Sequence, residues 1–435
     1  MSQLTLHQEE KLNEINFLLS TGHKRILLKG SAGVGKTFLV NELIKSLKSS
    51  TKWIPKILAS TPTHKALAVL RGKITEDIIL NTIHSILQYR FYTNPQTGEK
   101  EFVSVPNQRY PPLKGVKYLI IDEVSMIPLE MLLTIEQHAK EQKTTVIFIG
   151  DDKQLNPVKE NDSPVFLGCP LLLEDKKTLS YTPYPTVKLT EIIRQGKGNP
   201  IIELSRNIIN IWKSRDSFLI EDKGYLYTEN TQKIVAELAL VNGTDELKYL
   251  AWTNNEVNVV NEVVRHLIYG DNPAKIEQGE TIVFNAPYAL GKEILYQTNE
   301  EIKVETLEIV KKIYPIQFTD RGNDIKREYK IYLINDEVQV IHEDSMDIYK
   351  KDIEAMKINC FKRVLSFVYR NDFIDTFADF KYNHAITVHK SQGSTYKKVI
   401  LNVGDLNRNF NNIEKQRLFY TAITRASDLL ILYNV

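Results

Sequence analysis

The chain has 435 residues, of which 42% are hydrophobic and 25% are charged, and these values are typical of a soluble globular protein of about three domains. Its two cysteines, Cys169 and Cys360, are too few for a disulfide framework or a multi-cysteine metal site and indicate a reducing compartment. No apolar run is long enough to span a bilayer, and the N-terminus is polar, so we expect no membrane segment.

Charge is distributed unevenly along the chain. By formal charge, residues 1–190 and 381–435 carry +5 each, whereas residues 191–380 carry −8. If a polyanion binds, the two basic ends should therefore form its groove. Charge alone would favour ordinary solvated surface as the explanation of such small local excesses.

The first motif in the chain predicts a phosphate-binding loop. An apolar run at residues 26–28 leads into Gly-x-x-x-x-Gly-Lys-Thr, and apolar residues at helical spacing follow. Glycines let backbone N–H groups turn inward around a phosphate, and the new helix adds its positive N-terminal dipole. We expect Lys36 to reach the β- and γ-phosphates of ATP and Thr37 to bind Mg²⁺. The nucleotide-binding residues predicted here are Gly30, Ser31, Ala32, Gly33, Val34, Gly35, Lys36, Thr37 and Phe38.

A β-hairpin is predicted between the first motif and the next. Residues 90–105 alternate between apolar and polar positions on both sides of a turn at 94–98. Phe91, Tyr92 and Phe102 are aromatic residues at its tip or flanks.

Two later strand ends supply groups that ATP hydrolysis needs. One apolar run ends in Asp122 and Glu123, and another, at residues 145–149, is followed by Gln154. Because parallel strands bring their carboxyl ends to one crevice, these side chains should meet the phosphate loop. We predict that Asp122 binds Mg²⁺ directly or indirectly and that Glu123 orients and deprotonates the attacking water. Gln154 would then sense the γ-phosphate.

The acidic middle of the chain carries a further insertion. Residues 300–318 and 327–345 have the pattern of short β-strands, and residues 346–373 have a helical pattern.

The remaining segments predict a second α/β domain without a phosphate loop. Residues 251–261 indicate a strand and a helix, and residues 384–403 indicate two strands around a polar loop with Gly393. Residues 417–435 indicate a helix that carries Arg425, and then a final strand. We infer two motor-type domains that share one nucleotide.

Arg194 and Arg425 are the candidates to stabilise the charge that develops on the γ-phosphate. A guanidinium in that place is typically worth about 10³–10⁵ in rate. Because it arrives only when the cleft between the domains closes, it would also couple hydrolysis to domain motion. An ordinary surface salt bridge is the alternative for each arginine.

Taken together, the motifs resemble those of superfamily 1 helicases, and above all of the 1B branch that contains RecD and the Dda helicase of T-even phages. In chain order they are GSAGVGKT, STPTHKALAVL, TIHSIL, DEVSM, GDDKQLNPV, LTEIIRQ, AWTNNEVNVVN, ITVHKSQGST and YTAITRA. The resemblance implies ATP-dependent translocation on single-stranded DNA and unwinding of duplex in the 5′-to-3′ direction. It also matches Gln8 to an adenine-contacting glutamine and places Gly393 in the nucleotide site.

The same resemblance implies an α/β fold with two RecA-like parallel-sheet motor domains in tandem. The first motor is expected at residues 1–88 and 112–190, with a β-hairpin insertion, the pin, at 89–111. The second motor is expected at residues 191–272 and 383–435. A small SH3-like β-barrel with a helical arm would interrupt the second motor at residues 273–382. The pin could be the wedge at a DNA fork, with its aromatic residues stacked on bases, or a ribbon that only packs on the motor.

The resemblance also implies a track for single-stranded DNA across both motors. Most of its residues are small and polar, which suits phosphate and sugar contacts that do not read sequence. Those matched in the first motor are Thr61, Pro62, Thr63, His64, Thr82 and His84, and those in the second are Asn254, His389 and Lys390. Each histidine has an alternative role in the core or as a helix cap.

Alternatives of other classes remain at this point. The same motor could act on RNA or on both nucleic acids, or the chain could grip strands under nucleotide control without unwinding them. We expect single-stranded DNA and DNA forks as partners, with replication or recombination proteins as further candidates. We also expect a functional monomer in the cytoplasm of a bacterial or phage-infected cell.

Overall fold

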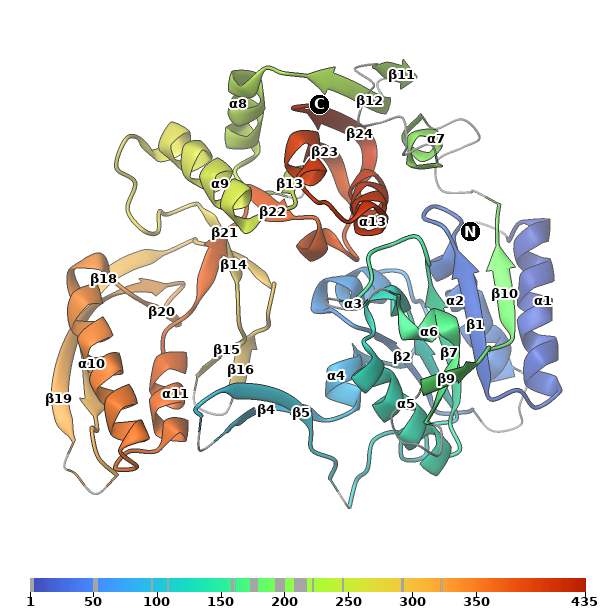
Figure 1. Ribbon diagram of the computed structural model, residues 1–435, viewed down its shortest axis with the longest axis horizontal. Helices are drawn as coiled ribbons and strands as arrows, with labels where there is room; N and C mark the ends of the chain where they lie inside the picture. The colour runs from blue at the N-terminus through green and yellow to red at the C-terminus, as the bar shows by residue number, and fades with distance from the viewer. Residues whose placement is uncertain are drawn as a thin grey trace.

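The computed structural model describes residues 4–49, 54–94, 97–107, 109–157, 160, 162–172, 179–191, 200–206, 217–220, 223–244, 246–290, 293–320, 322 and 324–435. Within them, two six-stranded sheets with flanking helices form two bodies, and a third body of short strands and two helices lies beside them (Figure 1). We call the first two the first and second motor and the third the inserted body. In the described part, no helix is both long and apolar enough to cross a membrane.

The sheet of the first motor is parallel throughout, in the order β10-β1-β7-β6-β2-β3. Its strands are β1 (Arg25–Gly30), β2 (Ile57–Thr61), β3 (Ile79–Thr82), β6 (Tyr118–Ile121), β7 (Thr145–Gly150) and β10 (Thr186–Leu189). Helices cover both faces, so inner strands such as β2 and β7 are buried along their whole length. Alternate residues enter opposite cores: Leu27 packs in one, and Ile26 and Leu28 pack in the other.

Helices on the two faces of this sheet complete those cores. Ile15 of α1 and Leu43 of α2 pack on one face, and Leu132 of α5 packs on the other. The helical segments of this motor are α1 (Leu6–Ser20), α2 (Lys36–Ser49), α3 (His64–Arg71), α4 (Ile83–Ile86), the 3₁₀ turn η1 (Val124–Met126), α5 (Leu129–Glu141) and α6 (Pro164–Leu167). A ribbon of β8 (Cys169–Leu172) and β9 (Leu179–Thr182), which the sequence patterns did not predict, precedes β10.

The second motor has the strand order β11-β12-β24-β23-β13-β22, with only the edge strand β11 antiparallel. The strands are β11 (Phe218–Ile220), β12 (Lys223–Thr228), β13 (Leu247–Ala251), β22 (Ala385–Thr387), β23 (Tyr396–Asn402) and β24 (Ala426–Tyr433). Its helical segments are α7 (Pro200–Arg206), α8 (Thr231–Val241), α9 (Asn254–Tyr269), η3 (His389–Ser391), α12 (Val403–Asn407) and α13 (Asn412–Ile423). Arg425 therefore lies just beyond α13, not within it as the sequence pattern predicted.

The inserted body lies between β13 and β22 in the chain. Its strands are β14 (Thr281–Phe284), β15 (Tyr288–Leu290), β16 (Glu293–Tyr296), β17 (Glu301–Lys303), β18 (Leu307–Ile316), β19 (Ile325–Ile334), β20 (Val338–Ile341) and β21 (Phe380–Tyr382). They form three small antiparallel sheets whose side chains share one core around Phe284, Tyr332 and Val340. A closed SH3-like barrel therefore stays a prediction.

The expected helical arm consists of two helices rather than one continuous segment. They are α10 (Glu343–Phe361) and α11 (Phe367–Asp375). The first begins earlier than predicted because His342 caps it by accepting a hydrogen bond from the backbone N–H of Asp344. Phe367 and Phe373 of α11 pack into the same core as Met356 of α10.

The predicted hairpin consists of β4 (Tyr89–Thr93) and β5 (Lys100–Ser104). It extends from the first motor to α11 of the inserted body (Figure 1). The Nδ2 group of Asn371 donates hydrogen bonds of 3.2 Å to Thr93 Oγ1 and to the Gly98 carbonyl. The turn is thus held by the arm. Tyr92 is half exposed, while the side chains of Phe91 and Phe102 lie outside the described part.

Candidate functional site: a nucleotide pocket between the two motors

The phosphate-binding loop connects β1 to α2, as the sequence predicts. Gly33 and Gly35 adopt left-handed φ angles of +83° and +78°, which residues with a Cβ rarely adopt. A Cβ on Gly30 would lie only 2.7 Å from Cγ2 of Val34. The glycines at these places therefore permit the tight wrap of the loop.

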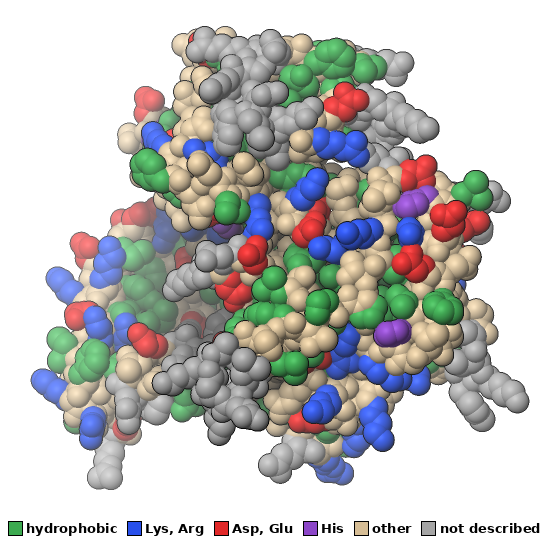
Figure 2. Space-filling model, turned by 45° about the vertical axis from the view of Figure 1, so that its right-hand side comes forward, with side chains coloured by type: hydrophobic (Ala, Val, Ile, Leu, Met, Phe, Trp, Pro, Cys, Tyr) green, Lys and Arg blue, Asp and Glu red, His purple; other side chains and the backbone are tan. Residues whose placement is uncertain are grey.

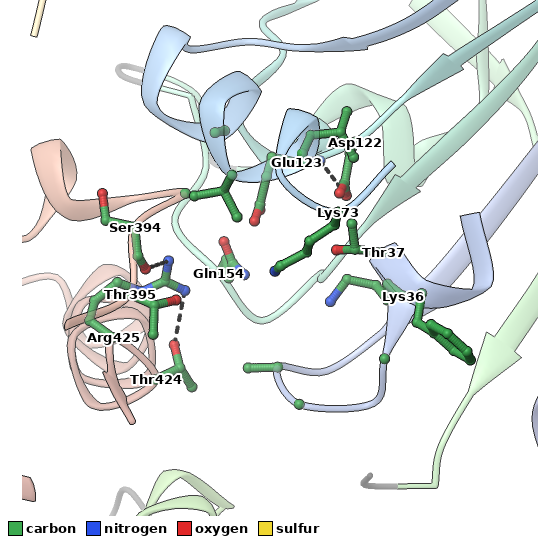
Figure 3. A pocket seen from close by; sticks show the side chains of 18 of the residues that line it. Lys36, Thr37, Lys73, Asp122, Glu123, Gln154, Ser394, Thr395, Thr424 and Arg425 are labelled. Carbon is green, nitrogen blue, oxygen red and sulfur yellow. Dashed lines mark hydrogen bonds between the residues drawn. The ribbon is translucent and has the colours of Figure 1, made fainter. Parts of the chain in front are cut away.

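A cavity of about 370 Å³ lies beside this loop, and both motors line it. Figure 3 shows Lys36 and Thr37 on one side, Asp122 and Glu123 on a second, and Arg425 opposite them. The predicted residues that line the cavity are Gln8, Ala32, Gly33, Gly35, Lys36, Thr37, Phe38, Asp122, Glu123, Gln154, Gly393 and Arg425. Gly30, Ser31 and Val34 belong to the loop but not to the cavity wall, and Arg194 lies outside the described residues.

Lys36 is the first residue of α2 and currently hydrogen-bonds its own loop. Its Nζ group donates to the carbonyl oxygens of Gly30 at 2.8 Å and Ser31 at 3.1 Å. No carboxylate among the described residues forms an ion pair with it. The ammonium group therefore donates only to carbonyl oxygens of the loop among the described residues, and a phosphate oxygen can replace these as the acceptor.

Asp122 and Glu123 follow β6 in a constrained backbone turn. Glu123 has a φ of +56°, an unfavourable conformation for a residue with a Cβ, and its N–H donates to Asp122 Oδ1 at 2.8 Å. Burial and the nearby Glu123 charge raise the pKa of Asp122 to about 6, although Lys36 opposes them. The Oε2 atom of Glu123 is buried and has no hydrogen-bond partner among the described residues. Such an oxygen is placed to accept a hydrogen bond from a water in the cavity.

Gln154 offers a second unpartnered oxygen to the same cavity. Gln154 is 2% exposed, and its Oε1 atom has no hydrogen-bond partner in the part of the chain that the structure describes. An unsatisfied buried polar atom is costly, so it marks a place where a ligand or water completes the structure. The role of Gln154 at the nucleotide stays a prediction.

Arg425 reaches the cavity from the second motor. Nε donates to the Thr421 carbonyl at 3.0 Å, one terminal nitrogen to the Ser394 carbonyl at 2.9 Å, and the other to Thr424 Oγ1 at 3.2 Å. The side chain is buried, and no carboxylate of the described residues pairs with it. Its charge is therefore held in place by neutral acceptors and stays available to an anion.

Gln8 is at the edge of the cavity, but its amide group already has partners. Its oxygen accepts from the N–H of Thr5, and its nitrogen donates to the Val34 carbonyl at 3.5 Å. The first contact belongs to the capping box of α1. An adenine contact by Gln8 stays a prediction.

The oxygen atoms of the Thr37 and Asp122 side chains are suitable ligands for a magnesium ion. A hydroxyl and a carboxylate line the cavity together, and Mg²⁺ is commonly held by one or two carboxylates with substrate phosphates completing its shell. The structure described here contains no cluster of three or more His, Cys, Asp or Glu side chains suited to a metal, so the fit depends on phosphate oxygens.

Some polar residues in or beside the site, among them Lys73, Asp151 and Tyr420, were not assigned by the sequence patterns. Lys73 lines the cavity, and its charge lowers the pKa of Asp122. The Tyr420 hydroxyl donates to Asp151 Oδ2 at 2.5 Å and accepts the Ala32 N–H at 3.1 Å. Tyr420 and Asp151 stood inside recognised motifs, but only the fold brings them to the phosphate loop, and nothing in the local pattern marks Lys73.

A second cavity brings together part of the predicted DNA track. It lies where the first motor, the second motor and the inserted body meet, and it has a volume of about 370 Å³. Its lining includes Thr63, His64, His389 and Lys390 from the predicted set, and also Lys65 and Asn299. Burial lowers the pKa of both histidines, so they are neutral hydrogen-bonding groups at neutral pH.

The other predicted track residues do not line this cavity. Thr61 and Thr82 are buried: Thr61 donates to the Thr63 carbonyl, and Thr82 caps α4. Both hydroxyls are thus out of reach of a strand in this conformation. Pro62 is buried, and His84 packs edge-on against Tyr89.

Asn254, the remaining described residue of the predicted track, is exposed at the start of α9. The predicted basic groove is not visible as one surface on the face shown in Figure 2, where Lys and Arg side chains are mixed with Asp and Glu.

Two family models, several curated proteins and several solved structures are similar to this chain. Residues 17–160 match the family model described as an AAA domain, and residues 382–433 match the UvrD-like helicase C-terminal domain. Uncharacterized protein R530 of Acanthamoeba polyphaga mimivirus is 25% identical over 96% of this chain and 96% of its own length. The RecBCD enzyme subunit RecD of Buchnera aphidicola (subsp. Schizaphis graminum) is 24% identical over 100% of this chain and 74% of its own length. The crystal structure of Pif1 helicase from Bacteroides in complex with ADP-AlF3 and ssDNA has a TM-score of 0.51 at 17% identity, covering 99% and 92% of the two chains.

Two parallel sheets that meet across a phosphate loop and an arginine define the class of tandem RecA-like motor proteins, and this predicted fold is confirmed. Within that class, the chain is similar to the RecD subunit and to Pif1 helicases, and two separate parts of it match family models of an AAA domain and a UvrD-like helicase C-terminal domain. The narrower likeness to Dda stays a prediction.

Proposed function

We propose that this chain is an ATP-dependent DNA helicase that translocates on single-stranded DNA and unwinds duplex. One observation carries the proposal: Lys36 of the first motor and Arg425 of the second line the same cavity. A triphosphate bound there would contact both bodies at once. Its hydrolysis would then change how the two motors sit against each other, which is the requirement for stepping along a strand.

The residues of the cavity divide the chemistry between them. Lys36 and the loop N–H groups hold the phosphates, and Arg425 stabilises the charge that develops on the γ-phosphate. Glu123 Oε2 accepts a proton from the attacking water, and Gln154 Oε1 accepts a hydrogen bond that positions that water, while its side-chain nitrogen can donate to the γ-phosphate. Thr37 and Asp122 would hold Mg²⁺, which neutralises phosphate charge.

The second cavity is the proposed contact for the DNA strand. His64 and Lys65 come from the first motor, and His389 and Lys390 come from the second. A strand held by both groups would feel any change in the distance between the motors. The 5′-to-3′ direction rests on resemblance to RecD and its relatives alone. Replication or recombination proteins as partners, and work in the cytoplasm of a bacterial or phage-infected cell, are also proposals.

ATP hydrolysis with and without single-stranded DNA tests the motor. We expect strong stimulation by DNA in the unmodified chain and loss of hydrolysis in Lys36→Ala. Lys45→Ala is the matched control, because Lys45 lies on the same helix and pairs with Glu42 on the surface. An ATP hydrolysis rate that is the same with and without nucleic acid would contradict the proposal. Matched DNA and RNA oligomers distinguish a DNA motor from an RNA motor through the 2′-hydroxyl.

Unwinding of duplexes with either a 5′ or a 3′ single-stranded tail tests the helicase activity and its direction. We expect ATP-dependent unwinding of the 5′-tailed duplex. Translocation without unwinding on either substrate would instead indicate a protein that grips strands without separating them. Lys390→Ala should weaken strand binding, whereas Lys397→Ala, at an exposed pair with Glu246, should not.

A further inference from the structure

Tyr420 connects the second motor to two parts of the nucleotide site that the first motor contributes. It lies in the last turn of α13 and is almost fully buried. Its hydroxyl donates to Asp151 Oδ2 at 2.5 Å, directly after β7, and accepts the N–H of Ala32 in the phosphate loop at 3.1 Å. One phenol group therefore uses both its donor and an acceptor across the boundary between the motors.

The neighbouring residues of the second motor hold the same strand end at a second point. Thr421 Oγ1 accepts the N–H of Leu155 at 3.2 Å, and the side-chain nitrogen of Gln392 donates to the Leu155 carbonyl at 3.2 Å. The segment from Asp151 to Leu155, which carries Gln154, is thus fixed at both ends by the second motor. We call these contacts the α13 clasp.

The clasp continues directly into Arg425. The Thr421 carbonyl accepts the Nε–H of Arg425 at 3.0 Å, so the guanidinium takes its position from the last turn of α13. Any displacement of that turn from Asp151 and Ala32 would move Arg425 away from the phosphate loop.

We propose that Tyr420 is a positioning residue for ATP hydrolysis, which sets Arg425 and Gln154 against the phosphate loop by docking α13 on Asp151 and Ala32. The inference rests on the proposed function and adds a residue to it. Tyr420 does not line the cavity among the described residues, so it acts through its neighbours and not on the nucleotide. Removal of its hydroxyl should lower turnover while leaving the phosphate-binding groups in place.

The Tyr420→Phe variant keeps the ring and removes both hydrogen bonds. We expect kcat for DNA-stimulated ATP hydrolysis to fall about tenfold, with the KM for ATP changed by less than about twofold, because the lost contacts position groups that act in the transition state. Tyr433→Phe is the matched control. Tyr433 also lies in the second motor, and its hydroxyl contacts Thr231 far from the cavity wall.

A double-mutant cycle with Arg425→Ala separates positioning from general stability. Because Tyr420 positions Arg425 as well as Gln154, Tyr420→Phe should cause a smaller loss of kcat in the Arg425→Ala background than in the unmodified chain. An equal loss in both backgrounds, or a loss that appears only as a lower melting temperature or a higher KM, would overturn the inference. An unchanged kcat in Tyr420→Phe would overturn it too. Absence of DNA-stimulated hydrolysis in the unmodified chain would overturn the proposed function, and with it this inference.

Discussion

Replacement of Arg425 by alanine is the most direct test of the shared site. The guanidinium is buried and faces the cavity with no carboxylate of the described residues to offset its charge. At an effective dielectric constant of about 20, one unit of charge about 4 Å away is worth about 4 kcal/mol. Because each 1.36 kcal/mol corresponds to about tenfold in rate, Arg425→Ala should lower kcat by about 10³.

Phosphate release at saturating ATP and single-stranded DNA measures this loss, and equilibrium binding of a non-hydrolysable ATP analogue measures retention of the site. Binding should weaken by less than about tenfold, since Lys36 and the loop remain. Arg425→Lys should recover little, because a lysine cannot reproduce the three directed contacts of the guanidinium. Arg408→Ala, which removes an exposed arginine of the same motor, is the control. A loss in kcat below tenfold for Arg425→Ala would refute the idea that the two motors act on one phosphate.

Three further outcomes are expected. Glu123→Gln should bind the ATP analogue normally yet hydrolyse ATP about 10²–10⁴ times more slowly in a rapid-quench assay, because the amide cannot accept the proton of the attacking water. Weak binding of the analogue with normal turnover would contradict this expectation. Gly393→Ala should lower DNA-stimulated turnover, since Gly393 has a φ of +76° and the new Cβ would lie 2.8 Å from the Ala66 Cβ. If this clash is the cause, a second substitution, Ala66→Gly, should restore part of the activity. His384 has its pKa lowered from 6.5 to about 4 by burial and by the charge of Lys248. Because the unfolded chain takes up that proton first, the free energy of unfolding should fall by about 3 kcal/mol as the pH drops from 6.5 to 4, and urea titrations of His384→Phe should show a smaller fall.

Much of the first motor could be predicted because its motifs are local. The order strand, glycine-rich loop and helix around Lys36 is encoded within a few residues, and Asp122 and Glu123 directly end an apolar strand. The meeting of Asp122, Glu123 and Gln154 at this loop required only the rule that parallel strands end at one edge of a sheet. Arg425 does not follow from that rule, because it precedes β24 instead of following a strand, and its exact place depends on where α13 stops.

The parts that could not be predicted depend on contacts between distant segments. Tyr420 meets Ala32 and Asp151 only after both motors have folded, so no periodicity in its own helix marks it. Thr61 and Thr82 resembled strand contacts, yet their hydroxyls satisfy local backbone groups at helix starts.

The position of β24 has a consequence for how this protein is made. The strand lies inside the second sheet between β12 and β23, although it follows every other strand of that sheet in the chain. The sheet of the first motor is complete once β10 has been synthesised. Domains generally fold in order during synthesis. The phosphate loop of the first motor can therefore form well before α13 and β24, which flank Arg425, have been synthesised. A chain released before β24 is made would therefore carry the loop proposed to bind ATP while the sheet beside Arg425 is still incomplete.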